Sequence, residues 1–219
     1  MPSASLKYAD AEDRAYGLCG MALALYIYDA EQFIDNISID APADLGLTLS
    51  ADFFAPSNPN LSVKAVWKES FRNFQILSAM VIGNVLSRSL SRRHSELANN
   101  VKSLVFSALT DEGDASCGLT ETEVESVCSR SFDYIARVLR NPTVAAAVDS
   151  MVRELNSARS LDRDRILAHF LPPAASLRAC LIRNHSINEN QPPKYSLRPC
   201  RPARRSSPHH TLHGCRQRG

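Results

Sequence analysis

The chain of 219 residues is 44% hydrophobic and 22% charged, which is the composition of a folded protein with one sizeable core. Its formal net charge is +2, but residues 1–171 carry 16 Lys/Arg and 22 Asp/Glu, whereas residues 172–219 carry nine Lys/Arg and one acid, Glu189. The chain is too long and too apolar to need a disulfide scaffold, and its six widely spread cysteines contain no C-x-x-C pair.

The change in charge at residue 172 coincides with other changes in composition. Residues 172–219 hold seven of the twelve prolines and four of the six histidines. Such a segment cannot bury enough apolar surface to offset the entropy of ordering it. We therefore expect a helical globular domain over residues 1–171 and a disordered basic tail over residues 172–219. An extension outside the native reading frame would have the same composition, and intact mass spectrometry distinguishes the two origins.

Apolar residues at steps of three and four predict a first helix over residues 8–37, with Leu18, Leu25 and Phe33 on its buried side. Gly17 and Gly20 lower the helical propensity of its first half. These glycines indicate either close packing against another helix or a break into two pieces.

Residues 40–62 contain Pro42, Pro56 and Pro59 and do not continue the helical pattern. Apolar and polar residues alternate from 45 to 53, which is the periodicity of a strand. With no sheet predicted elsewhere, we expect an extended connection packed across the helices. The alternative is a strand that pairs with another chain. The candidate interaction surface consists of the apolar residues of this stretch, namely Leu45, Leu47, Leu49, Phe53 and Phe54.

The second predicted helix, over residues 62–91, is apolar on nearly every face for three turns. A helix of this kind is buried on all sides. We expect it to run through the centre of a bundle or through a subunit interface. Ser78 and Asn84 lie in this stretch, and each needs a hydrogen-bond partner if it is buried.

The rest of the domain predicts four further helices. A helix over residues 95–109 is followed by an acidic loop at 111–114, and Thr120 and Glu123 have the spacing of a capping box that opens the next helix. Asn141 and Pro142 then predict an N-cap and a first helical position. The last helix is expected over residues 161–171. The sequence thus predicts an all-α fold, an irregular single-domain bundle of about six helices.

Residue types that carry chemistry do not form a recognisable motif. The acidic loop lacks the ligand spacing of a calcium site, and the cysteines and histidines after residue 199 lack that of structural zinc. Cys117, expected in a loop, has no predicted catalytic histidine beside it. Cys19 and Cys128 fall on apolar stripes and are interpreted as buried hydrophobes, and His169 as a satisfied histidine between helices. We expect no catalytic, cofactor-binding or metal-binding residue.

These observations favour a non-catalytic helical interaction or assembly module, with a protein or a further copy of the chain as its partner. One alternative is a nucleic-acid-associated protein whose basic tail contacts phosphates. The candidate phosphate contacts are Arg198, Arg201, Arg204 and Arg205. Another alternative is a small-ligand binder or enzyme with a pocket between helices.

The longest apolar run near the start of the chain covers residues 18–28. Eleven residues are too few to span a bilayer as a helix, which needs about 20. Acidic residues outnumber basic ones before this run, which is the reverse of a signal peptide. We expect a cytoplasmic protein that is not in a membrane.

Overall fold

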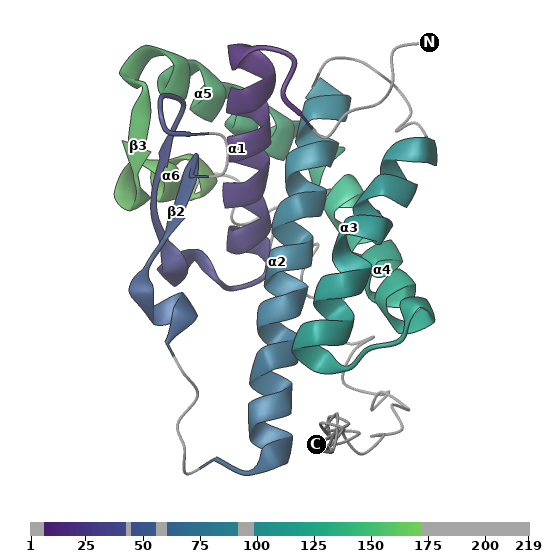
Figure 1. Ribbon diagram of the computed structural model, residues 1–219. Helices are drawn as coiled ribbons and strands as arrows, with labels where there is room; N and C mark the ends of the chain where they lie inside the picture. Colours follow the sequence, from purple (N-terminus) through teal and green to yellow (C-terminus); the bar gives the residue numbers. More distant parts are fainter. Residues whose placement is uncertain (1–6, 43–44, 56–60, 92–98, 172–219) are drawn as a thin grey trace, which may run out of the picture.

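The computed structural model describes residues 7–42, 45–55, 61–91 and 99–171. These residues are mostly helical, with six α-helices and a small three-stranded sheet. Helices α1 (Ala11–Ile27) and α2 (Val63–Ser91) lie side by side at the centre. Helix α5 and the sheet pack against α1, and helices α3 and α4 pack against α2 (Figure 1). The prediction of a helical bundle is confirmed.

Helix α1 begins at an N-cap, Asp10, whose side chain accepts a hydrogen bond from the Asp13 backbone N–H at 2.8 Å. It ends at Ile27, ten residues before the predicted end. Asp29 adopts a left-handed backbone with φ 50°, which a helix cannot continue. A short 3₁₀ helix, η1 (Glu31–Phe33), leads into strand β1 (Ile34–Ser38). The prediction of a helix over residues 28–37 is therefore wrong. It depended on Phe33 and Ile37, which fit the helical spacing although they lie in or next to a strand.

The two central helices touch through glycine. A Cβ atom on Gly20 would collide with the Gly83 carbonyl group and would lie 2.5 Å from the Ser87 Cβ. A Cβ on Gly83 would in turn meet the Gly20 carbonyl and lie 2.9 Å from the Ala24 Cβ. Only glycine allows two helix backbones to approach so closely. Of the two interpretations of the early glycines, close packing is therefore correct, and α1 has no break.

The strand-like alternation after residue 44 forms a real strand, β2 (Leu47–Leu49). It pairs antiparallel with β1, which pairs antiparallel on its other edge with β3 (Ser160–Asp162), giving the order β2-β1-β3. Ile37 lies opposite Leu47 on one side and Leu161 on the other. The expectation of a connection without a sheet is wrong, because the partner strand β1 lies within the residues that the sequence predicts as the end of the first helix.

Helix α2 is buried only along its later turns. Phe74, Ile76 and Ile82 are buried, whereas the Val63 side chain is 88% exposed. Figure 1 shows the first turns of α2 extending beyond the other helices. The prediction of burial on all sides therefore applies to the part of α2 that begins near Phe74. The Ser78 hydroxyl is buried there and has no hydrogen-bond partner among the described residues.

Helix α3 (Asn99–Cys117) runs through the predicted acidic loop. Gly113 is a buried residue within this helix. Its missing side chain leaves room for α4, because a Cβ there would lie 2.5 Å from Val124 Cγ2. The helix stops at Gly118, whose φ is +64°. The loop prediction is wrong, since acidic residues on the solvent side are compatible with a helix. Cys117 is correspondingly the last helical residue and is buried.

The later element boundaries follow the predicted caps. Helix α4 (Glu121–Leu139) opens with the capping box of Thr120 and Glu123. Helix α5 (Pro142–Ala158) opens with Asn141 as N-cap and proline in the first turn. Both of these predictions are confirmed. Helix α6 (Arg163–Phe170) begins two residues after its predicted start, because residues 160–162 form β3, and the Asp162 side chain caps it.

Candidate functional site

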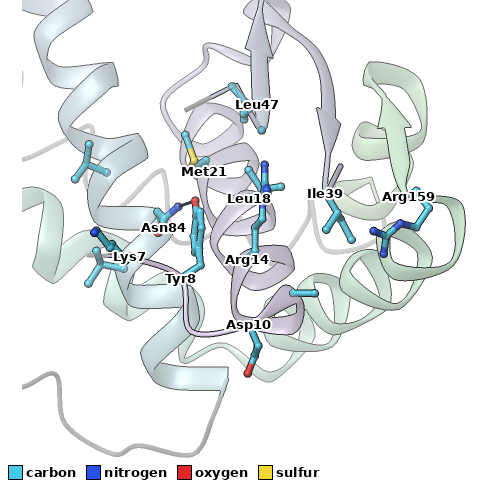
Figure 2. Close-up of a pocket in the computed structure, with 14 residues that line it drawn as sticks. Lys7, Tyr8, Asp10, Arg14, Leu18, Met21, Ile39, Leu47, Asn84 and Arg159 are labelled. Atoms are coloured by element: carbon cyan, nitrogen blue, oxygen red, sulfur yellow. Dashed lines mark hydrogen bonds between the residues drawn. The ribbon is translucent and has the colours of Figure 1, made fainter. Parts of the chain in front are cut away.

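A groove with a volume of about 920 Å³ lies between the start of the described chain, helices α1 and α2, and the connection from β1 to β2 (Figure 2). We call it the α1–α2 groove. Its apolar walls come from Leu18 and Met21 on α1, Val81 and Val85 on α2, and Ile39 and Leu47 beside the sheet. Its polar side chains are Lys7, Tyr8, Asp10, Arg14, Asn84 and Arg159.

The connection before β2 lies directly on α1 at Gly46. A Cβ on Gly46 would sit 2.7 Å from Leu18 Cδ2 and 3.2 Å from Arg14 Nη2. The absence of a side chain lets the backbone close one wall of the groove. Gly46 and Leu47 are buried, so this wall is part of the core of the domain.

Arg14 is the half-buried cation of the groove. Its Nη2 donates hydrogen bonds to the carbonyl oxygens of Ala41 and of Pro42, the latter at 2.9 Å. Its guanidinium carbon lies 5.9 Å from the centre of the Tyr8 ring. Among the described residues, no carboxylate forms an ion pair with Arg14, and its buried Nε has no hydrogen-bond partner. Neutral carbonyl groups thus fix this guanidinium, and the Asp40 carboxylate acts on it only at a distance, without an ion pair.

A buried ion pair holds the start of the described chain against the two central helices. Arg88 Nη2 lies 2.7 Å from Asp13 Oδ2, and the two side chains are 12% and 5% exposed. The same guanidinium donates a hydrogen bond to the Lys7 carbonyl oxygen at 2.8 Å and lies 4.9 Å from the Tyr8 ring centre. The Ala9 backbone N–H donates to Asp13 Oδ2 at 2.9 Å. Residues 7–9 are therefore ordered by the charge pair beneath them.

This arrangement places Tyr8 over α2. Asn84 Nδ2 donates a hydrogen bond to the Tyr8 hydroxyl at 2.7 Å, and both side chains line the groove. Gly17 gives them room, because a Cβ there would lie 2.8 Å from Asn84 Nδ2 and 2.8 Å from Tyr8 Cε1. The prediction that Asn84 needs a partner is confirmed, and the partner is at the groove.

The far rim of the groove carries a second ion pair. Arg159 donates hydrogen bonds to both carboxylate oxygens of Asp40, one of them at 3.2 Å. These bonds hold the pKa of Asp40 below its usual value, and the carboxylate raises the pKa of Arg159. Both side chains are about half exposed, so the pair adds little stability. It neutralises one of the three cations that line the groove.

The residues proposed as an interaction surface differ in exposure. Leu45 and Phe54 are 58% and 69% exposed, whereas Leu47 and Phe53 are buried and Leu49 is half-buried. Leu47 instead forms part of the groove wall. The candidate phosphate contacts are Arg198, Arg201, Arg204 and Arg205, and they lie outside the described residues.

Histidine and cysteine side chains of the described residues have structural roles. His169 Nε2 lies 2.6 Å from Glu154 Oε2 and so joins α6 to α5, as interpreted from the sequence. Cys19 and Cys128 are fully buried, and burial raises the pKa of both thiols, to about 11 for Cys128. Burial also raises the pKa of Cys117 to about 11. The interpretation of Cys19 and Cys128 as buried hydrophobes is confirmed.

Tyr8 and Arg14 were not singled out from the sequence, although both are in the groove. Neither belongs to a motif, and Tyr8 precedes the first predicted apolar stripe. The pair of glycines at 17 and 20 was the available signal, since it indicated that α2 or another element comes close to this face of α1.

No three His, Cys, Asp or Glu side chains within residues 7–42, 45–55, 61–91 and 99–171 come together as metal ligands. No helix in these ranges combines the length and apolar character needed to cross a membrane.

No protein-family model matches the sequence, and no curated protein is similar to it at a significant level.

Proposed function

We propose that this protein is a binding module for a small molecule, which it holds in the α1–α2 groove without covalent chemistry. The observation that carries the proposal is the groove itself, with a volume of about 920 Å³. Small-molecule sites are usually about 300–1,000 Å³, mostly apolar, with a few placed polar groups. The groove has seven apolar side chains, Ala11 included, with Tyr8, Arg14 and Asn84 held in place by their own contacts.

The lining residues support binding rather than catalysis. Among the described residues, no histidine, cysteine, serine, threonine or glutamate lines the groove. Its one carboxylate, Asp10, already accepts the hydrogen bond that caps α1. The groups most often used as nucleophile and base, a serine or cysteine beside a histidine, are therefore not among the described residues of the groove.

A thermal-shift screen against a small-molecule panel tests the proposal, because a ligand that binds the native state raises its melting temperature. The wild type is compared with Val81→Phe, which adds bulk to the groove wall. Leu104→Phe is the matched control, since Leu104 is partly exposed on α3 and does not line the groove.

We expect compounds that raise the melting temperature of the wild type and of Leu104→Phe but not that of Val81→Phe. Shifts of equal size in all three proteins would contradict the proposal, as would a panel without any shift.

A specific observation favours a second function, that of an interaction module. Leu61 and Val63 are large apolar residues with exposed side chains at the projecting start of α2, and Phe54 is exposed earlier in the chain. Exposed apolar surface of this kind is typical of contact sites between proteins. Light scattering over a micromolar concentration range tests it. A concentration-dependent mass that Val63→Ser abolishes would support this function, and a constant monomeric mass would count against assembly.

A further inference from the structure

We infer that the α1–α2 groove binds an amphipathic anion, a flexible hydrocarbon chain that ends in a carboxylate or a phosphate. The inference rests on the proposed function and names the chemical class of its ligand. Two features of the groove carry it: the sign of its charge, and the kind of apolar side chain that forms its walls.

The charge of the groove is opposite to that of the domain around it. Residues 1–171 contain 16 Lys/Arg and 22 Asp/Glu, yet three cations and one carboxylate line the groove. With Asp40 included as the partner of Arg159, three cations stand beside two carboxylates. Concave sites concentrate the field of the charges that line them. An anion is therefore attracted to this groove and repelled by the domain surface as a whole.

Arg14 is the anchor for the anionic group. Its carbonyl partners, Ala41 and Pro42, hold the guanidinium in place but carry no charge. Both of these hydrogen bonds come from Nη2, and a guanidinium has five N–H donors. Hydrogen bonds between an arginine and a carboxylate or phosphate are about twice as strong as neutral ones.

Tyr8 supplies a second donor to the same end of the groove. Its hydroxyl accepts the hydrogen bond of Asn84, so the hydroxyl proton is available to an oxygen of the ligand. Two guanidinium groups lie close to the ring, with the Arg14 carbon 5.9 Å and the Arg88 carbon 4.9 Å from its centre. The donor is thus positioned before any ligand binds.

The walls favour a flexible chain over a flat ring. Every apolar side chain that lines the groove is aliphatic, and Met21 adds an unbranched, adaptable one. Among the described residues of the groove, the aromatic side chain is that of Tyr8. Its ring already has the guanidinium groups of Arg14 and Arg88 as neighbours. Each buried methylene of a hydrocarbon chain contributes about 0.8 kcal/mol to its transfer from water.

The test is calorimetric titration with four probes of equal chain length, each below its micelle-forming concentration. These are dodecanoate, dodecyl phosphate, dodecanol and dodecyltrimethylammonium. We expect one or both anions to bind the wild type at least about tenfold more tightly than dodecanol, which corresponds to one charge-assisted contact, and the cation to bind more weakly still. The anion with the higher affinity identifies whether a carboxylate or a phosphate is preferred.

Variants locate the anionic end. Arg14→Gln should weaken binding of the preferred anion about tenfold and leave dodecanol unchanged. Lys7→Gln, at an exposed side chain, should weaken the anion about threefold through loss of attraction alone. Arg137→Gln, on the exposed surface of α4, makes the same change of net charge and should have no effect.

The outcomes separate the inference from the proposed function. The amphipathic-anion inference would be overturned if dodecanol and both anions bound the wild type with equal affinity and if Arg14→Gln and Lys7→Gln left these affinities unchanged. If Val81→Phe still abolished that binding, the groove would remain a ligand site for another class of molecule. Binding that Val81→Phe leaves unchanged would overturn the groove as a site and the proposed function with it.

Discussion

Asp13 and Arg88 show how one buried charge pair orders the entrance of the groove. Removing one partner leaves the other charge buried without compensation, which costs about 3–5 kcal/mol in typical proteins. We predict that Arg88→Met lowers the free energy of unfolding by an amount in this range, measured by urea denaturation. Both side chains are nearly inaccessible to water, so solvent cannot replace the lost partner.

The double variant Asp13→Asn/Arg88→Met is the informative companion. Because it removes both charges, it should be more stable than Arg88→Met alone. Arg137→Met, at an exposed position, should change the free energy of unfolding by less than about 0.5 kcal/mol. An Arg88→Met variant as stable as Arg137→Met would contradict the account of the pair.

Glu154 gives a pH-dependent contribution at the junction of α5 and α6. Hydrogen bonds from Arg165, and then from His169, hold its pKa below the usual value of 4.5. A carboxyl group with a lowered folded-state pKa stabilises the fold above its unfolded pKa, and this stabilisation is lost as pH falls through the folded pKa. We predict that Glu154→Gln is less stable than the wild type at pH 7. The difference should disappear at a pH well below 4.5.

Denaturation of both proteins across this pH range measures the effect. A difference that persists unchanged at acid pH would contradict a role for the ionised carboxylate. The side chain of Glu154 is 35% exposed, so solvent screens the interaction and the expected effect is modest.

At the scale of elements, the crossing of α1 and α2 at Gly20 and Gly83 sets the geometry of the domain. Gly20→Ala forces a methyl group against backbone, which no rotamer change relieves. We predict a loss of about 3 kcal/mol in the free energy of unfolding, at the upper end of the cost of overpacking. Gly118→Ala is the comparison, since no atom lies within 4 Å of its Cβ position and only its left-handed backbone opposes the change. Equal losses in the two variants would contradict close packing as the role of Gly20.

The start of α4 depends on its capping box. The Thr120 side chain accepts the hydrogen bond of the Glu123 backbone N–H, and Glu123 accepts that of Thr120. Thr120→Ala should therefore cost about 1 kcal/mol in thermal or urea unfolding. Thr122→Ala, at an exposed helical position next to the box, should change stability by less than about 0.5 kcal/mol. The reverse order of the two effects would be evidence against the cap.

The starts of helices α4 and α5 were predictable because residues close in sequence determine them. Caps at Thr120 and Asn141 depend on side chains within three residues, so the sequence was sufficient to find them. The sheet was not predictable in the same way. Strand β1 is five residues long and pairs with β3, over 120 positions further along the chain. Long-range pairing overrides local periodicity, and Ile37, which lies in the strand, also fits the helical spacing.

The groove was only partly predictable for the same reason. Asn84 was expected to need a partner because it lies in an apolar helix, which is a local argument. That the partner is Tyr8, 76 residues earlier, follows from the packing of α1 against α2. Arg14 gave no signal, because its role depends on the carbonyl groups of a connection that folds back onto α1.

At the scale of the whole molecule, a negatively charged domain encloses a groove whose lining is positive. Dissolved salt screens the attraction between the charges of the groove and an anionic ligand. The Debye length, over which this attraction decays, is about 10 Å at 0.1 M salt. We predict that raising the salt concentration from 0.05 to 0.5 M weakens dodecanoate binding several-fold but not dodecanol binding. Equal salt dependence of the two probes would indicate that the groove's charge has no part in recognition.

The most direct test uses the methionines as reporters. Met21 lines the groove, whereas Met80 and Met151 are buried in the core. In a titration of ¹³C-methyl-methionine-labelled protein with dodecanoate, followed by NMR, the account predicts a saturable shift of the Met21 signal and little change at Met80 and Met151. A titration in which Met21 does not shift, or in which the core methionines shift as much as Met21 does, would contradict ligand binding in the α1–α2 groove.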